Sequence, residues 1–144
     1  MVKSMMDLSA NTLLLGEKGI IAPQGLSPLV LAYVGDGVYE MLVRLSVLSE
    51  GNAPVNLLHK KSRNLVNAKA QRELYFRIEH ALTEDEAAVF RRGRNAKSHT
   101  SPKNGDLIDY RHATGLEALF GFLYLDGQQE RVLELFALGM EEVL

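Results

Sequence analysis

The segment that most constrains the fold runs from residue 27 to residue 51 and reads SPLVLAYVGDGVYEMLVRLSVLSEG. It opens with Ser27, a residue type that caps helix N-termini, and with Pro28, which is favoured at the first helical position. It ends at Gly51, the residue type that most often follows a helix. Between these signals the apolar residues predict one long helix that must be largely buried. Other elements must therefore pack around it.

The rest of the chain predicts helices and no sheet. Residues 53–82 carry apolar side chains at helical spacing with a basic exposed side, and a bend near Asn67 predicts two helices. Thr83 and Glu86 form a capping box that begins a helix running to about Arg94. Further helices are predicted over residues 107–125 and 128–144. Because no segment alternates as a strand with hairpin chemistry, we predict an all-α fold.

The chain has the size and composition of one domain, with 144 residues of which 47% are hydrophobic. Residues 1–25 contain glycine and proline without sustained periodicity, and predict a partly irregular leader before a domain over residues 26–144. Cysteine is absent, which excludes disulfides and thiolate metal sites. No apolar run approaches the ~18 residues of a membrane span. We therefore expect a soluble, cytoplasmic protein.

Charge is distributed unevenly along the chain. Residues 59–103 hold 11 Lys or Arg residues against 5 Asp or Glu residues, whereas the remainder holds 5 against 13. One interpretation is a face that attracts a polyanion beside an acidic region that holds cations. The other is two ordinary solvated helix faces, and charge counts alone leave both open.

Asp36 stands between two glycines in the middle of the first long helix. Each glycine costs a helix interior about 1 kcal/mol relative to alanine, so Gly35 and Gly37 need a compensating role. A glycine lets another backbone or a ligand approach the helix, and we therefore interpret Asp36 as a functional carboxylate. For Glu40, one turn later, a surface ion pair with Arg44 is favoured.

Glu117 is the only acidic or basic residue, histidine aside, between Arg111 and Asp126, on a helix that is apolar on almost every side. A buried carboxylate is costly unless it has a partner such as a basic residue or a metal ion. Asp36 lies on the other strongly apolar helix, and both helices should pack in the core. If the two carboxylates meet, they form a hard-cation site suited to Mg²⁺ or Mn²⁺.

Several motifs resemble the ribonuclease III family. The stretch YVGDGVYE at residues 33–40 is similar to that family's signature helix, and GLEALFGFLYLD at residues 115–126 is similar to its second acidic helix. With KSHTSPKN at 97–104, YRHATGLEAL at 110–119 and no double-stranded RNA-binding domain after them, the chain resembles the short members called Mini-III. The resemblance implies a helical catalytic domain that forms a homodimer with an RNA-binding valley between two catalytic sites.

The resemblance implies that Asp36 and Glu117 are the catalytic, metal-binding carboxylates. The chain also departs from the pattern of the larger family members. Their glutamates seven and four residues before the signature aspartate are Leu29 and Ala32 here, and their aspartate three residues before the second glutamate is Thr114. Mini-III members share these departures. The Thr114 hydroxyl or a water could take the place of the missing carboxylate.

The function implied by the resemblance is a Mg²⁺-dependent endoribonuclease that cuts structured double-stranded RNA and leaves 5′ phosphates and 3′ hydroxyls. The implied natural substrate is the precursor of large-subunit 23S ribosomal RNA, with a large-subunit ribosomal protein as a helper. Two alternatives stay open. One alternative, suggested by the missing carboxylates, is a non-catalytic RNA-binding module of the same fold. The other is a helical dimer that binds DNA.

RNA contacts are expected mainly from residues 91–104, which hold five positive charges and no acid. Duplex RNA is recognised through phosphates and 2′-hydroxyls, which basic and small polar side chains can bind, although a solvated loop is the alternative. The predicted RNA contacts are Arg91, Arg92, Arg94, Asn95, Lys97, Ser98, His99, Thr100, Lys103 and Asn104, with Lys60 and Lys61 as weaker candidates. The residues predicted to orient metal-bound water are Tyr33, Glu40 and Thr114.

Overall fold

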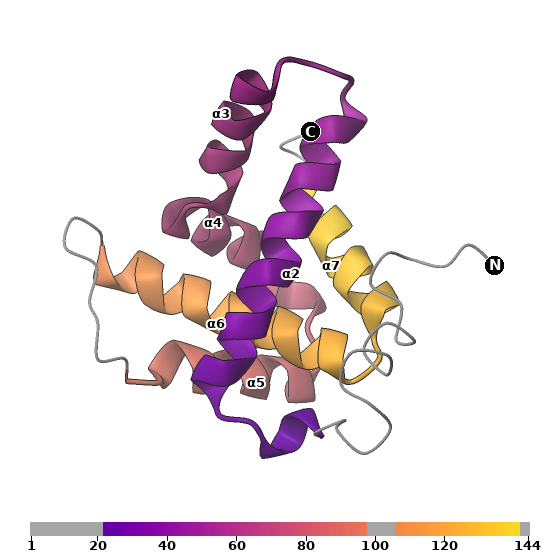
Figure 1. The fold of residues 1–144 in the computed structure, drawn as a ribbon. Coiled ribbons are helices and arrows are strands. Elements are labelled where there is room, and N and C mark those ends of the chain that lie inside the picture. Colours follow the sequence, from indigo (N-terminus) through magenta and orange to yellow (C-terminus); the bar gives the residue numbers. More distant parts are fainter. Residues whose placement is uncertain (1–21, 98–105, 142–144) are drawn as a thin grey trace.

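The computed structural model describes residues 22–97 and 106–141, and all regular structure in these ranges is helical (Figure 1). Its elements are η1 (Pro23–Gly25), α2 (Pro28–Ser49), α3 (Val55–Val66), α4 (Ala68–Ile78), η2 (Glu79–Ala81), α5 (Glu84–Asn95), α6 (Leu107–Leu125) and α7 (Gln129–Met140). The all-α prediction is thereby confirmed. Most of the predicted leader lies outside the described residues. None of the described helices is both long and apolar enough to cross a membrane.

The long helix α2 begins and ends where its local signals predict. The Ser27 hydroxyl accepts a hydrogen bond from the backbone N–H of Val30 at 3.3 Å, and Pro28 occupies the first helical position. Gly51 follows the helix with a φ of 133°, a conformation that favours glycine. Both ends of α2 are thus set by neighbouring residues in the sequence, and the helix between them runs through the core without interruption.

Helices α2 and α6 cross with their backbones in direct contact (Figure 1). A Cβ atom on Gly35 of α2 would lie 1.6 Å from the carbonyl oxygen of Glu117 on α6. A Cβ atom on Gly121 of α6 would lie 2.0 Å from the carbonyl oxygen of Leu31 on α2. Only glycine fits at either position, and the contact explains why α2 tolerates Gly35.

The second glycine of the motif has a different environment. A Cβ atom on Gly37 would meet no described atom within 4 Å, and the residue is exposed. The prediction that a close approach explains both glycines therefore holds within the described residues for Gly35 alone.

The other side of α6 is covered by α5 in the same way. A Cβ atom on Gly93 would lie 2.7 Å from the Cβ of Ala118, and one on Gly115 would lie 2.8 Å from the carbonyl oxygen of Phe90. Helix α6 is thus held between α2 and α5, with α4 also packed against it. This placement buries nine residues of α6 between Ala113 and Leu123, including Phe120.

Helices α3 and α4 meet at Asn67, where the sequence predicts a bend. The Asn67 side chain accepts a hydrogen bond from the N–H of Ala70 at 2.8 Å and so caps the start of α4. The buried phenol of Tyr39 in α2 donates to the carbonyl of Leu65 at 2.7 Å. The end of α3 is therefore tied both to α4 and to the central helix α2.

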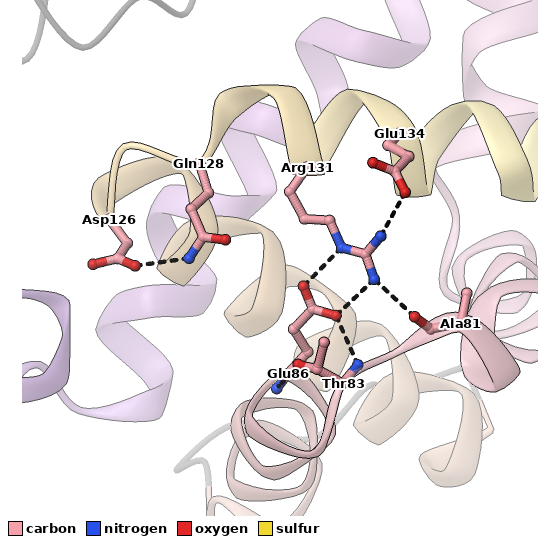
Figure 2. Close-up of polar contacts among 7 residues, drawn as sticks. All are labelled: Ala81, Thr83, Glu86, Asp126, Gln128, Arg131 and Glu134. Atoms are coloured by element: carbon pink, nitrogen blue, oxygen red, sulfur yellow. Dashed lines mark hydrogen bonds and ion pairs between the residues drawn. The ribbon is translucent and has the colours of Figure 1, made fainter.

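Helix α7 is fastened to the start of α5 by the guanidinium of Arg131 (Figure 2). This group donates to both carboxylate oxygens of Glu86, at 2.8 and 2.9 Å, and to the carbonyl of Ala81 at 2.7 Å. Glu86 also accepts from the backbone N–H of Thr83 at 2.9 Å, so the predicted capping box is present. The hydrogen bond from Arg131 lowers the pKa of the Glu86 carboxyl, as expected for a bidentate pair.

We expect Gly35→Ala to destabilise the protein and Gly37→Ala to stabilise it. Alanine at Gly35 forces apart two backbones, which should cost about 3 kcal/mol of unfolding free energy or more. Alanine at Gly37 meets no described atom and should gain about 1 kcal/mol through helix propensity. Urea unfolding of both variants and the wild type at one protein concentration measures the difference. Equal effects of the two substitutions would contradict a backbone contact at Gly35.

Candidate active site

The structure brings together the two carboxylates singled out in the sequence. Asp36 follows Gly35, whose backbone touches the carbonyl of Glu117, so the helix crossing itself places the two residues side by side. Their carboxyl groups are close enough for Asp36 to raise the pKa of Glu117. Asp36 is exposed and Glu117 is partly buried. The pair therefore lies at the molecular surface, with Asp36 as its outer member.

The electrostatics of the pair are unfavourable without a cation. Burial above all, and then the interaction with the negatively charged Asp36, raise the pKa of the Glu117 carboxyl to about 8, while Gln71 acts in the opposite direction. Neither carboxylate forms an ion pair with a Lys or Arg of the described residues. In the folded chain a proton is therefore the group that neutralises Glu117 when no metal ion is present.

The donor set of this pair fits a hard divalent cation. Carboxylate oxygens are the ligands that Mg²⁺ and Mn²⁺ prefer, and a cation between Asp36 and Glu117 would relieve their repulsion. No cluster of three or more His, Cys, Asp or Glu side chains suited to a metal occurs within residues 22–97 and 106–141. Two carboxylates would thus hold the ion, and water would supply its other ligands, as is usual for Mg²⁺.

The residues predicted to orient water make contacts of their own. Tyr33 is 82% exposed and Glu40 accepts a hydrogen bond from Arg44 at 3.0 Å, the surface pair that the sequence favours. Thr114 is buried, and its hydroxyl donates to the carbonyl of Tyr110 at 3.0 Å. The Thr114 proton is therefore engaged by its own helix.

One residue near the pair was missed from the sequence. Gln71 in α4 is only 4% exposed and lowers the pKa of the Glu117 carboxyl. A signal was present, because Gln71 precedes Leu74, Tyr75 and Ile78 by helical spacing and all three are buried. A polar residue at a core position of a helix is one that needs a partner.

The predicted RNA contacts fall in separate places. Arg91, Arg92, Arg94 and Asn95 form the last turn of α5, and the exposed Lys97 follows it. Lys60 and Lys61 lie on α3, at the other end of the described fold from α5 (Figure 1), and Lys61 pairs with Glu50 at 3.4 Å. Ser98, His99, Thr100, Lys103 and Asn104 lie outside the described residues.

The last turn of α5 is itself ordered by local contacts. Arg94 donates from Nε to the Asn95 side chain at 3.1 Å, and its guanidinium lies 5.9 Å from the centre of the Phe90 ring. Arg91 and Arg92 are exposed. A hollow beside this turn, lined by Pro28, Leu31 and Arg92 among others, includes neither carboxylate of the pair. The carboxylates therefore lie outside this hollow.

The metal-free protein should lose stability as pH rises through the pKa of Glu117. The folded state holds this proton up to a pKa of about 8, whereas the ordinary value is 4.5, so the folded state binds more protons between these values. The free energy of unfolding should therefore fall from about pH 5 to pH 8. Thermal unfolding in EDTA across this range measures the effect.

Glu117→Gln is the control for this pH dependence, because it removes the titrating group. The variant should show a shallower fall, and saturating Mg²⁺ should flatten the wild-type profile because the cation replaces the proton. Identical profiles for wild type and Glu117→Gln in EDTA would rule out a raised Glu117 pKa.

Comparison with known proteins matches residues 29–128 to the Ribonuclease III domain. A Mini-ribonuclease 3 from Thermoanaerobacter sp. (strain X514) is 46% identical over 143 residues, which cover 99% of each chain. A Mini-ribonuclease 3 from Brevibacillus brevis is 48% identical over 113 residues, or 78% of this chain and 84% of the relative. A crystal structure of a Fusobacterium nucleatum protein aligns with a TM-score of 0.74 and 30% identity over 83% of this chain and 96% of that one. The chain therefore belongs to the ribonuclease III family.

Proposed function

We propose that this protein is a Mg²⁺-dependent endoribonuclease that hydrolyses double-stranded RNA, with Asp36 and Glu117 as its metal-binding catalytic residues. The observation that carries the proposal is the meeting of these two carboxylates in a chain of the ribonuclease III family. Mn²⁺ should substitute for Mg²⁺, because both ions prefer oxygen ligands in octahedral geometry.

The two carboxylates have different tasks in this proposal. A bound Mg²⁺ would lower the pKa of a water ligand and neutralise charge that develops on the phosphate. Glu117, partly buried between helices, gives the ion a fixed ligand, and the exposed Asp36 holds it on the side open to the substrate. Attack of this water on phosphorus with cleavage of the bond to the 3′ oxygen would leave a 5′ phosphate and a 3′ hydroxyl.

The distribution of charge supports a duplex RNA substrate. Arg91, Arg92 and Lys97 are exposed at the end of α5 and lead into the basic and polar residues 98–104. A-form RNA offers phosphates and 2′-hydroxyls and hides its base edges, which suits a surface of this kind. From the resemblance to Mini-III we further propose that the substrate is the precursor of 23S ribosomal RNA, shaped by a large-subunit ribosomal protein.

The exposed face of α2 supports a homodimer. Val30, Tyr33, Met41 and Leu48 are exposed large hydrophobic residues at helical spacing on this helix. Large exposed apolar surfaces on a soluble chain mark interaction sites. A second copy packed on this face would place two carboxylate pairs in one particle, so that each strand of a duplex could be cut.

Cleavage of a long RNA duplex tests the activity. The wild type with Mg²⁺ should produce fragments with 5′ phosphates, and EDTA should stop the reaction. Asp36→Asn and Glu117→Gln should each lower the rate by about 100-fold or more, because each loses a ligand of an ion that stabilises the transition state by several kcal/mol. Glu130→Gln, which changes an exposed carboxylate on α7, should cleave as the wild type does.

The same assay separates the two classes of function. Duplex RNA that is retained but never cut, with any divalent metal, would support the non-catalytic binding module. Full activity of Glu117→Gln would remove the carboxylate pair from the reaction.

The dependence of RNA binding on salt tests the basic surface. In the uncleaving Glu117→Gln background, Lys97→Ala should reduce the slope of log affinity against log salt by about one per lost phosphate contact. Lys61→Ala should leave the slope unchanged, because Lys61 lies on α3 and pairs with Glu50. Competition with duplex DNA, which should bind more weakly, excludes the DNA-binding alternative. An unchanged slope for Lys97→Ala would place the contact elsewhere.

A further inference from the structure

Gln71 occupies a position that an apolar residue would ordinarily fill. It lies on the face of α4 that also carries Leu74 and Ile78, both fully buried, and its own exposed fraction is 4%. Burying an amide costs free energy unless its hydrogen bonds are made. The partners of Gln71 should therefore explain why the chain has an amide here.

The first partner is the carbonyl of Val66. Val66 is the last residue of α3, and its carbonyl lacks the usual helical partner because the N–H of Ala70 bonds to the Asn67 side chain at 2.8 Å. Gln71 Nε2 donates to this carbonyl at 2.9 Å. The Gln71 amide is thereby anchored to the junction of α3 and α4. Asn67 stabilises the same junction by a further hydrogen bond, which its side-chain nitrogen donates to the carbonyl of Arg63 at 3.1 Å.

The second neighbour is the Glu117 carboxyl of α6, whose pKa the Gln71 side chain lowers. An amide nitrogen carries two N–H groups, so Val66 and Glu117 can use one each. The opposite orientation would set the Gln71 oxygen against a carbonyl oxygen and against a carboxylate, so the contacts fix which way the amide faces. The buried oxygen Oε1 has no hydrogen-bond partner among the described residues.

We propose that Gln71 is a positioning residue for the metal-binding pair: anchored on the Val66 carbonyl, it donates its second N–H to Glu117 and fixes that carboxylate in the orientation that faces Asp36. The inference rests on the proposed function, since it takes Asp36 and Glu117 as the metal ligands. Groups that hydrogen-bond a metal ligand in this way orient it and set its affinity for the ion. The side chain acts through Glu117 and needs no contact with RNA.

Two properties of glutamine suit this role. A leucine or methionine would fill the same space but leave both the Val66 carbonyl and the Glu117 carboxylate without a donor. A glutamate would bring a third negative charge to a pair that already has no cationic partner among the described residues. An amide supplies donors to both partners without adding charge.

Binding of Mn²⁺ to the RNA-free protein tests the inference. The electron paramagnetic resonance signal of free Mn²⁺ reports the affinity directly, with Mn²⁺ as the probe. Gln71→Met, which keeps the length of the side chain and removes the donor, should weaken binding by about 10- to 100-fold. In the cleavage assay the Mg²⁺ concentration for half-maximal rate should rise by a similar factor, while kcat at saturating Mg²⁺ changes less.

Asn67→Ala is the matched control, because it removes the cap of α4 at the same junction and leaves the Gln71 amide in place. It should lower the melting temperature without changing Mn²⁺ affinity. If it weakens Mn²⁺ binding as much as Gln71→Met does, Gln71 has only a structural role and the inference fails. Should Gln71→Met not fold, Gln71→Asn, which is too short to reach both partners, takes its place in the same comparison.

Glu117→Gln distinguishes the two possible failures. If Glu117→Gln abolishes Mn²⁺ binding but Gln71→Met binds as tightly as the wild type, the metal site stands and the role of Gln71 is refuted. If Glu117→Gln itself binds Mn²⁺ normally, the proposed metal site is wrong, and the positioning role fails with it.

Discussion

The arrangement of this protein depends on the direct contact between the backbones of α2 and α6. Gly35 and Gly121 remove the side chains that would otherwise separate the two helices, and the Glu117 carbonyl lies where a Cβ of Gly35 would be. Residues next to such a crossing have little freedom to move apart, because interiors are closely packed. Asp36 is the next residue on α2, so the contact that builds the core also brings the two carboxylates together.

The same contact creates an electrostatic problem that the described chain does not solve with a basic side chain. Glu117 lies on the central helix α6, and its carboxyl lies beside that of Asp36. Proteins usually pair a buried charge or bind a metal with it. Here the chain provides an amide, Gln71, which stabilises the charged form without cancelling the charge. The remaining repulsion is a driving force for binding a cation.

Much of this fold is predictable from the sequence because its helix ends are set by local chemistry. Ser27 with Pro28, Asn67, and the box of Thr83 and Glu86 all cap helices where the sequence predicts them. The close approach at Gly35 was predicted as well, but its partner was not, because Asp36 and Glu117 are 81 positions apart and this separation says nothing of how two apolar helices cross. Placing both carboxylates on apolar helices made their meeting a reasonable hypothesis, and the structure confirms it.

The parts that sequence reasoning missed are those that depend on which face a neighbour covers. A close approach of another group was predicted to explain both glycines beside Asp36. Gly35 is indeed buried against α6, but Gly37 is exposed. Gln71 was passed over because it lies in a basic segment and carries no charge. Its importance comes from Val66 and Glu117, which reach it from two other parts of the chain.

The small number of carboxylates has a consequence for how such a site can be held. Where larger family members carry further acids, this chain has Leu29, Ala32 and Thr114, and the last two are buried against the core. Fewer carboxylates reduce repulsion in the metal-free protein, but they also leave the ion with fewer protein ligands. Each remaining ligand must then be oriented more strictly, because an error in one is not compensated by the others. A buried amide anchored on the Val66 carbonyl and directed at Glu117 meets that requirement, and this is the physical reason to expect Gln71 to affect metal binding.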